Sequence, residues 1–260
     1  MLAAGALESP ALLMRSGLRS PHLGRHLYLH PTVAVTGTYP SPIEAWRGPP
    51  QTIVCDEFSN LSKGYGYRIE AAPAHPGLSA AGLPWSSARE HRREMQQVRF
   101  ASPFIVLTRD SNSGRVRITR DGEPYFDYRI GRAEKRLLKH GMATAARMHF
   151  AAGAERITTL HSSRLLWDRA ADRASIDKFC RLINAAPTSP NRLPLFSAHQ
   201  MGTCRMGADA GHAVCDADGA VYGVNVAYVA DASLFPASSG VNPMITIMAL
   251  AHHVAKEMTR

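Results

Sequence analysis

The hydrophobic and polar positions of this chain repeat with two different periods. In the first half, alternating or β-rich runs predict strands. These runs cover residues 32–38, 52–55, 65–69 and 104–108. Two more runs, RVRITR and YFDYRI, flank Asp121-Gly122 and predict a hairpin, because this dipeptide is typical of a tight turn. Helical periodicity follows over residues 133–154 and 175–185.

The two ends of the chain carry their own strand and helix signals. The opening MLAAGAL predicts the end of a buried strand and a glycine turn, and Ser9-Pro10 predicts a helix with Ser9 as its N-cap and Pro10 at its first position. Near the other end, residues 226–230 predict a strand. Asn242-Pro243 then predicts the start of a final helix, which we expect to be buried because its first two turns are apolar.

Strand signals at both ends, with a β-rich and helix-backed middle between them, predict a mixed α/β (α+β) fold with two lobes. The two ends of the chain would build one lobe jointly, and the middle would build the other. A Pro-rich connection, AAPTSPNRLP, leads from the middle to the C-terminal part. A chain of 260 residues is long enough to bury a substantial core in this arrangement.

Composition narrows the class of protein. The net charge of +9 invites a nucleic-acid interpretation, but the dense basic stretch REHRREMQQVR has no interleaved aromatics and no nucleic-acid-binding motif around it. We therefore expect no nucleic-acid partner and interpret that stretch as a solvated helix face. No apolar run approaches the roughly 18 residues of a membrane span, and the opening lacks the pattern of a signal peptide. The four cysteines form no CxxC pair, which favours reduced thiols and a cytoplasmic location.

The C-terminal part holds the candidate chemistry. His199 lies in a loop of small and polar residues, SAHQMGTCRMG, where a histidine is an ordinary hydrogen-bonding group or a catalytic one. The helix after Asn242 would offer backbone N–H groups to an anion, although an ordinary capped core helix explains the same pattern. Pairs of His199 with Cys204 and of His212 with Cys215 suggest zinc, but their intervals fit no finger or ribbon pattern, so we assign no metal. No GxSxG run indicates a serine hydrolase.

Three ordered segments of the chain resemble the glucose-methanol-choline (GMC) family of FAD-dependent oxidoreductases. GALESPALLMRSGL is similar to the family's second signature, and LGRHLYLHPT is similar to the segment that leaves the FAD domain for the substrate domain. The C-terminal run matches the family's His-x-x-Gly-Thr, Val-x-Asp-Ala-Ser and Asn-Pro blocks. Within the family, these runs are most similar to the long-chain fatty alcohol oxidase branch, and cholesterol-oxidase-like and generic alcohol dehydrogenase members are the alternatives.

The resemblance implies a division of the chain, a cofactor and a set of roles. Residues 1–30 and 195–260 would form part of a Rossmann-like FAD-binding lobe, and residues 31–194 would form a β-sheet substrate-binding lobe backed by helices. His199 would take the hydroxyl proton of a small-molecule alcohol, aliphatic or long-chain, while the hydride passes to flavin N5. Asn242 would donate its amide to the same oxygen. Contacts to FAD would come from Gly5, Asp231, Ala232, Pro243 and Met244.

The sequence also departs from the family pattern. It contains no GxGxxG run and no first signature block, so the resemblance implies that roughly the first half of a typical member is absent. We therefore expect the chain alone to bind FAD weakly or not at all. Three hypotheses follow: a truncated gene product, one half of a split enzyme with a separate N-terminal FAD-binding half, or an inactive fragment that serves as a binding or structural module.

Overall fold

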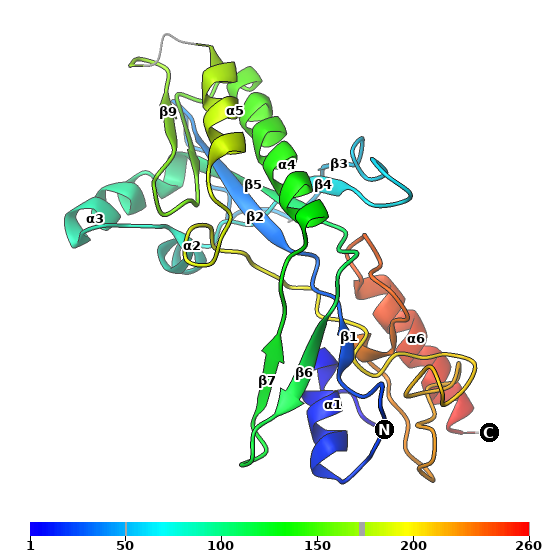
Figure 1. The fold of residues 1–260 in the computed structure, drawn as a ribbon. Coiled ribbons are helices and arrows are strands. Elements are labelled where there is room, and N and C mark those ends of the chain that lie inside the picture. Colours follow the sequence, from blue (N-terminus) through cyan, green and yellow to red (C-terminus); the bar gives the residue numbers. More distant parts are fainter. Residues whose placement is uncertain (50, 172–174, 260) are drawn as a thin grey trace. The chain divides into compact units, whose positions relative to one another are not determined.

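The computed structural model describes residues 1–49, 51–171 and 175–259, which divide into two compact units (Figure 1). The terminal unit consists of Met1–His30, Arg109–Gly131 and Ser197–Arg260, and the central unit consists of Pro31–Thr108 and Arg132–Phe196. Both units contain helices and antiparallel strands, which confirms the mixed fold class. The assignment of one lobe to FAD and the other to substrate stays a prediction.

A six-stranded antiparallel sheet forms the middle of the central unit. In spatial order its strands are β3 (Val54–Cys55), β4 (Tyr67–Ala71), β5 (Ala101–Thr108), β2 (Thr32–Thr38), β8 (Arg156–Thr159) and β9 (Leu166–Asp168). The helices of this unit are α2 (Pro76–Gly82), α3 (Ala88–Gln96), α4 (Arg132–Ala151) and α5 (Ile176–Ala185), with the 3-10 turn η1 (Val98–Phe100). The four predicted strands and the two predicted helices of the middle are confirmed. β2 matches its predicted range at both ends, and each of the other elements has one or both ends shifted by one to three residues.

One face of this sheet packs against α4 because its residues leave room for the helix. Val33 and Val35 of β2 are fully buried on that face. A Cβ atom on Gly37 would lie 2.4 Å from Nδ1 of His149 on α4, so the strand needs glycine at this position. The facing side of the helix is apolar and fully buried at Leu138, Met142, Ala145 and Ala146.

The terminal unit is built from shorter pieces. Its helices are α1 (Gly5–Arg15) and α6 (Met244–Glu257), its 3-10 turn is η2 (Ala232–Leu234), and its sheet contains β1 (Arg25–Leu27), β6 (Gly114–Ile118) and β7 (Pro124–Asp127). The predicted hairpin is confirmed, because Ile118 pairs with Pro124 and Gly122 has the positive φ of +84° that suits a tight turn. None of the helices that the structure describes is long and apolar enough to cross a membrane.

The prediction for the start of the first helix is wrong. α1 begins at Gly5, so Ser9 is not its N-cap and Pro10 lies inside the helix. A proline in that place lacks the N–H that would bond to the carbonyl of Ala6, one turn earlier. The hydroxyl of Thr203 donates to that carbonyl at 2.6 Å and replaces the missing bond. The helix therefore tolerates its proline because a residue far away in the sequence satisfies the orphaned oxygen.

The prediction of a strand at residues 226–230 is also wrong, and the strand end at the opening of the chain shrinks to one residue. Leu2 forms a single bridge with Val229, and Tyr228 forms a single bridge with Ala220. Val226 has a φ of +61°, which breaks the extended run that its β-branched side chain suggests. Isolated bridges of this kind make no ladder.

The final helix begins one residue later than predicted and is not buried at its start. Pro243, not Asn242, is the N-cap of α6. The side chains of Met244, Ile245 and Met248 are 65%, 69% and 61% exposed. The inward side of the helix is formed by Ile247, Leu250 and Val254, which pack against the apolar clusters of the terminal unit. The helix therefore has apolar side chains on two faces, one packed against its unit and one exposed.

Candidate active site

The loop that carries His199 is fixed by backbone bonds to two other segments of the terminal unit. Met201 and Tyr28 exchange two backbone hydrogen bonds of 3.0 Å each. Gly202 donates its N–H to the carbonyl oxygen of Ala232 at 3.1 Å, and its φ of +92° requires a glycine. The loop is therefore held between the end of β1 and the start of η2.

His199 contacts a second histidine, His30. Their Nδ1 atoms lie 3.2 Å apart, and the two rings meet edge-on, with centroids 5.3 Å apart and an interplanar angle of 86°. His30 is fully buried, and its Nε2 accepts the backbone N–H of Gly240 at 2.9 Å. Gly240 lies two residues before Asn242. His30 therefore connects the His199 loop to the segment that leads into Asn242.

A buried carboxylate, Asp110, holds the backbone around His30. It accepts hydrogen bonds from the backbone N–H of Leu29 at 2.8 Å and of His30 at 3.4 Å. The hydroxyls of Tyr128 and Ser238 donate to it at 3.0 Å and 2.7 Å. Burial raises the pKa of Asp110, and these hydrogen bonds oppose that rise. One side chain thus joins the end of β1 to the Ser238 segment.

Neither His30 nor Asp110 is among the site residues that the sequence predicts. His30 stands in the exit segment LGRHLYLHPT, where the sequence indicates only a family resemblance. Asp110 stands two residues after the apolar run 104–108, and an acidic residue so close to the end of a buried strand is the signal that could have marked it. The pairing of these residues with positions 238–240 depends on tertiary structure, since no local pattern relates them.

The environment of His199 favours its uncharged form. The side chain is half-buried, and burial lowers the pKa of His199 below its ordinary value, because desolvation penalises the imidazolium. Burial thus shifts the protonation equilibrium of His199 toward the neutral imidazole. A neutral imidazole is the form that accepts a proton in general base catalysis.

The second predicted catalytic residue, Asn242, lies at the exposed start of α6. The structure brings its segment to His30 through Gly240, and the buried ring of Pro243 follows it directly. The roles of Asn242 and His199 stay predictions.

Two of the predicted cofactor residues, Gly5 and Asp231, contact each other. The backbone N–H of Gly5 donates to Asp231 Oδ2 at 3.0 Å, and the Ser9 hydroxyl donates to the same oxygen. The backbone N–H of Ser233 donates to Oδ1 at 2.8 Å. The carboxylate of Asp231 is thus engaged by the protein itself and fixes the start of both α1 and η2. Any contact of this position with a cofactor would come from its backbone.

The other predicted cofactor residues lie at the ends of two helical elements. Ala232 begins η2, and its carbonyl oxygen is the acceptor for Gly202 described above. Pro243 and Met244 form the start of α6, whose first amide groups are not capped by any side chain that the structure describes. Next to these amides lies the exposed apolar face of Met244, Ile245 and Met248. Apolar side chains beside the positive end of a helix dipole fit a flat ring with an electron-rich edge, such as that of a flavin.

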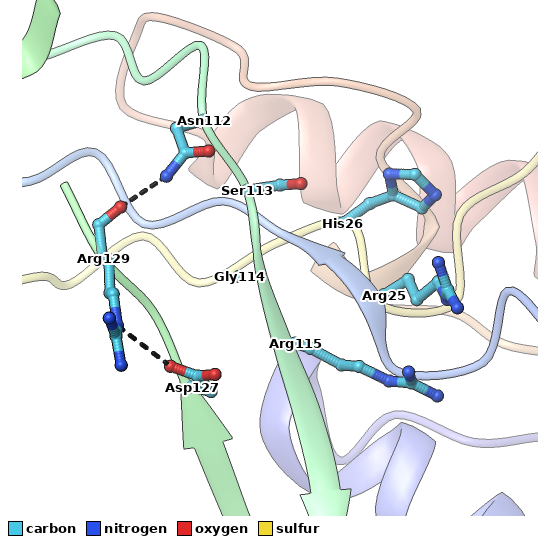
Figure 2. A pocket seen from close by; sticks show the side chains of 8 residues that line it. All are labelled: Arg25, His26, Asn112, Ser113, Gly114, Arg115, Asp127 and Arg129. Carbon is cyan, nitrogen blue, oxygen red and sulfur yellow. Dashed lines mark hydrogen bonds and ion pairs between the residues drawn. The ribbon is translucent and has the colours of Figure 1, made fainter. Parts of the chain in front are cut away.

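A separate cationic pocket of about 380 Å³ lies on the small sheet of the terminal unit (Figure 2). Arg25, Arg115 and Arg129 line it together with a single carboxylate, Asp127, which lies 4.0 Å from the Arg129 guanidinium. The pocket also contains His26, which has a φ of +63° at a bulge in β1. Burial and the nearby Arg205, His22 and Arg25 lower the pKa of His26 to about 4. The pocket contains none of the predicted site residues.

The histidine–cysteine pairs considered for zinc do not come together as a metal site. Among residues 1–49, 51–171 and 175–259, no group of three or more His, Cys, Asp or Glu side chains is placed to hold a metal ion. Cys204 and Cys215 are buried in an apolar cluster, and the exposed His212 bonds to Asp209 at 3.0 Å. Burial raises the pKa of both thiols.

Comparison with known families decides what kind of protein carries this site. Residues 110–251 match the C-terminal model of GMC oxidoreductases, and residues 1–32 match the N-terminal model of the same family. The chain belongs to the GMC oxidoreductase family. The resemblance inferred from the three sequence segments is thereby confirmed, and GMC oxidoreductases are FAD-binding flavoproteins.

Relatives extend over nearly the whole chain. The long-chain-alcohol oxidase FAO4A of Arabidopsis thaliana is 33% identical over 262 residues, which cover 97% of this chain and 36% of that protein. FAO3 of the same plant is 30% identical over 273 residues, which cover 99% of this chain and 36% of FAO3. An uncharacterized GMC-type oxidoreductase of Mycobacterium tuberculosis, Rv0492c, is 34% identical over 258 residues, which cover 99% of this chain and 39% of that protein. The chain thus spans between 36% and 39% of the length of these relatives.

Solved structures of other proteins share the fold of this GMC chain. Pyridoxine 4-oxidase from Mesorbium loti matches with a TM-score of 0.65 at 22% identity and covers 98% of this chain and 50% of that one. Formate oxidase of Aspergillus oryzae matches with a TM-score of 0.68 at 16% identity, and the match covers 99% of this chain and 53% of that one. At these identities the likeness establishes the fold alone.

Proposed function

We propose that this GMC chain provides the site at which an FAD-dependent enzyme oxidises the CH–OH group of an alcohol, with His199 as the base. The observation that carries the proposal is the contact of His199 with His30, because His30 also binds the backbone two residues before Asn242. Two segments far apart in the sequence, each with one predicted catalytic residue, are thereby joined through one buried side chain.

In this proposal the chain's own residues handle the proton and the oxygen. The alcohol gives up its hydroxyl proton to the neutral imidazole of His199 as its carbinol carbon loses a hydride. The side-chain amide of Asn242 donates to the same oxygen and stabilises the negative charge that develops on it. FAD, when bound, supplies the hydride acceptor. The amide groups and apolar side chains at the start of α6 would hold the ring in place.

We further propose that the alcohol is aliphatic and long. Two of the relatives named above are long-chain-alcohol oxidases. The central unit contains a cavity of about 370 Å³ on the sheet face opposite α4, lined by Ala34, Thr36, Ile105, Leu78, Leu83 and Phe196 among others. Apolar walls of this kind suit an alkyl chain, since each methylene group removed from water contributes about 0.8 kcal/mol.

Replacement of His199 tests the base. In the enzyme completed with an N-terminal FAD-binding half and loaded with FAD, we expect His199→Ala to slow flavin reduction by a long-chain alcohol by roughly 10²–10⁴-fold, the range of general base catalysis. Stopped-flow absorbance without oxygen measures this rate, and flavin fluorescence measures FAD affinity, which we expect to stay within a factor of about three. His212→Ala is the matched control, because His212 lies close by in sequence but is exposed. Unchanged reduction in His199→Ala would contradict the proposal.

Chain length tests the substrate class. Ala34→Phe would fill part of the cavity in the central unit, so we expect KM to rise for long-chain alcohols and to change little for short ones. An equal effect on both would argue against an alkyl site there.

Two further inferences from the sequence stay proposals. They are a separate N-terminal FAD-binding partner and a cytoplasmic location.

A further inference from the structure

The proton positions on His30 follow from a fixed donor. The backbone N–H of Gly240 can only donate, and it points at His30 Nε2 from 2.9 Å. The Ser239 hydroxyl is 3.5 Å from the same nitrogen, but it donates to the carbonyl of Val241 at 2.7 Å. A proton on His30 Nε2 would oppose the Gly240 N–H. Neutral His30 therefore has its proton on Nδ1.

That proton determines the tautomer of His199. The Nδ1–H of His30 points at Nδ1 of His199, 3.2 Å away, so this nitrogen of His199 accepts. The single proton of a neutral His199 must then lie on its Nε2. A second proton on either ring would face an existing N–H, at Gly240 or at His30. The contact thus favours two neutral rings, in agreement with the lowered pKa of His199.

His30 is held firmly in this arrangement. Its backbone has a φ of +50°, which is uncommon for a residue with a side chain. Asp110 fixes this conformation by accepting the N–H groups of Leu29 and His30 on one side and the Ser238 hydroxyl on the other. The donor on Gly240 and the ring of His30 are therefore positioned by the same carboxylate. The more accessible partner in this contact is His199, which is half-buried in its loop.

We propose that His30 is a positioning residue that holds His199 with its proton on Nε2, and that His199 gains a basic Nε2 only when its contact with His30 opens. The second part rests on the proposed function. In the closed contact, His199 would donate Nε2–H to the alcohol oxygen and orient it. Once the contact opens, exchange with water transfers that proton to Nδ1. The Nε2 lone pair then accepts the hydroxyl proton, and His199 becomes an imidazolium.

Nitrogen NMR of the 260-residue chain, labelled with ¹⁵N-histidine, tests the tautomers without FAD or substrate. We expect His30 to show a protonated Nδ1 and an unprotonated Nε2, which is the reverse of the preference of free histidine. We also expect a ¹⁵N–¹⁵N coupling through the hydrogen bond between the two Nδ1 atoms. Loss of single resonances in His30→Asn and His199→Gln assigns the signals. A protonated Nε2 on His30, or no coupling, would overturn the proposal.

Two substitutions of His30 separate positioning from a merely structural role. His30→Asn keeps an N–H donor near the place of Nδ1, so His199 should keep its proton on Nε2. His30→Leu removes the donor, and we expect the ratio of Nε2–H to Nδ1–H tautomers of His199 to fall roughly three- to tenfold, as the loss of one hydrogen bond predicts. Equal ratios in the two variants would overturn the proposal, and if His30→Leu does not fold, the wild-type coupling decides. Since no turnover is needed, retained flavin reduction in His199→Ala would defeat the proposed function alone.

Discussion

Each unit of this GMC chain buries a histidine whose ring nitrogens are both hydrogen-bonded, but the partners differ. In the central unit, His149 receives a hydrogen bond from the Tyr39 hydroxyl at 2.8 Å and donates to the carbonyl of Val35 at 3.1 Å. In the terminal unit, His30 binds one backbone amide and one further histidine, His199. The first ring is satisfied by groups that do not titrate near neutral pH. The second ring contacts a titratable ring, that of the half-buried His199, so the proton positions of the two histidines depend on each other.

The two units also differ in the interactions that stabilise the interior of each one. The central unit depends on apolar contact between a sheet and α4. The terminal unit also has an apolar core, and in addition buried carboxylates, Asp110 and Asp231, join its segments. All three tryptophans of the chain, Trp46, Trp85 and Trp167, belong to the central unit. Tryptophan fluorescence therefore reports unfolding of the central unit, and far-UV circular dichroism reports both.

Removal of the buried carboxylate should produce the largest effect on the terminal unit. Asp110→Ala leaves four donors without their acceptor, and we expect it to lower the free energy of unfolding by roughly 3–5 kcal/mol. Urea unfolding followed by circular dichroism measures this loss, while the fluorescence transition should change much less. Asp110→Asn keeps one acceptor oxygen and should lose roughly half as much. A loss below about 1 kcal/mol in Asp110→Ala would show that this network does not hold the unit together.

Acid should weaken the central unit through His149. Burial lowers the pKa of His149 from 6.5 to about 4, so at intermediate pH the unfolded chain binds a proton that the folded chain does not. The stabilisation is complete above about pH 6.5 and is lost as the pH falls to about 4, by roughly 3.5 kcal/mol at about 1.4 kcal/mol per pKa unit. Fluorescence-detected urea unfolding between pH 7 and pH 4 measures the slope. His149→Gln, which keeps a donor and an acceptor, should flatten it; an unchanged slope would assign the effect to other groups.

Close approach of β2 and α4 can be tested by one methyl group. Gly37→Ala would put its Cβ 2.4 Å from His149 Nδ1, and we expect a loss of roughly 1–3 kcal/mol from overpacking. Gly82→Ala is the matched control, because the nearest atom to its Cβ would be Phe196 Cζ at 3.6 Å, an ordinary contact. Thermal unfolding followed by fluorescence compares the two. Equal stability would mean that the helix can shift away at little cost.

The smallest effect concerns the proline inside α1. Thr203→Val removes the hydroxyl that donates to Ala6, and we expect a loss of about 1 kcal/mol. In a Pro10→Ala background, the new N–H of residue 10 can bond to the same carbonyl, so the Thr203→Val loss should shrink. A double-mutant cycle by urea unfolding measures this coupling. Additive losses would show that the hydroxyl does not replace the missing amide bond.

The sequence by itself determined the elements whose signals are local. β2 runs from Thr32 to Thr38 as its alternation predicts, and α5 follows Ser175, whose hydroxyl caps it by accepting the N–H of Asp177. The family motifs around His199 and Asn242 also stand in the sequence alone. Periodicity and short motifs suffice for these features, because each depends on neighbours within a few residues.

Only the tertiary structure decided the features that depend on distant partners. Pro10 lies inside a helix because Thr203 satisfies Ala6, and the apolar start of α6 is exposed because only one side of that helix meets the core of its unit. The contact of His30 with His199 spans 169 residues, and the contact of Asp110 with Ser238 spans 128. A hydrogen bond between such positions leaves no periodic trace in the sequence, since its geometry arises only when the chain has folded.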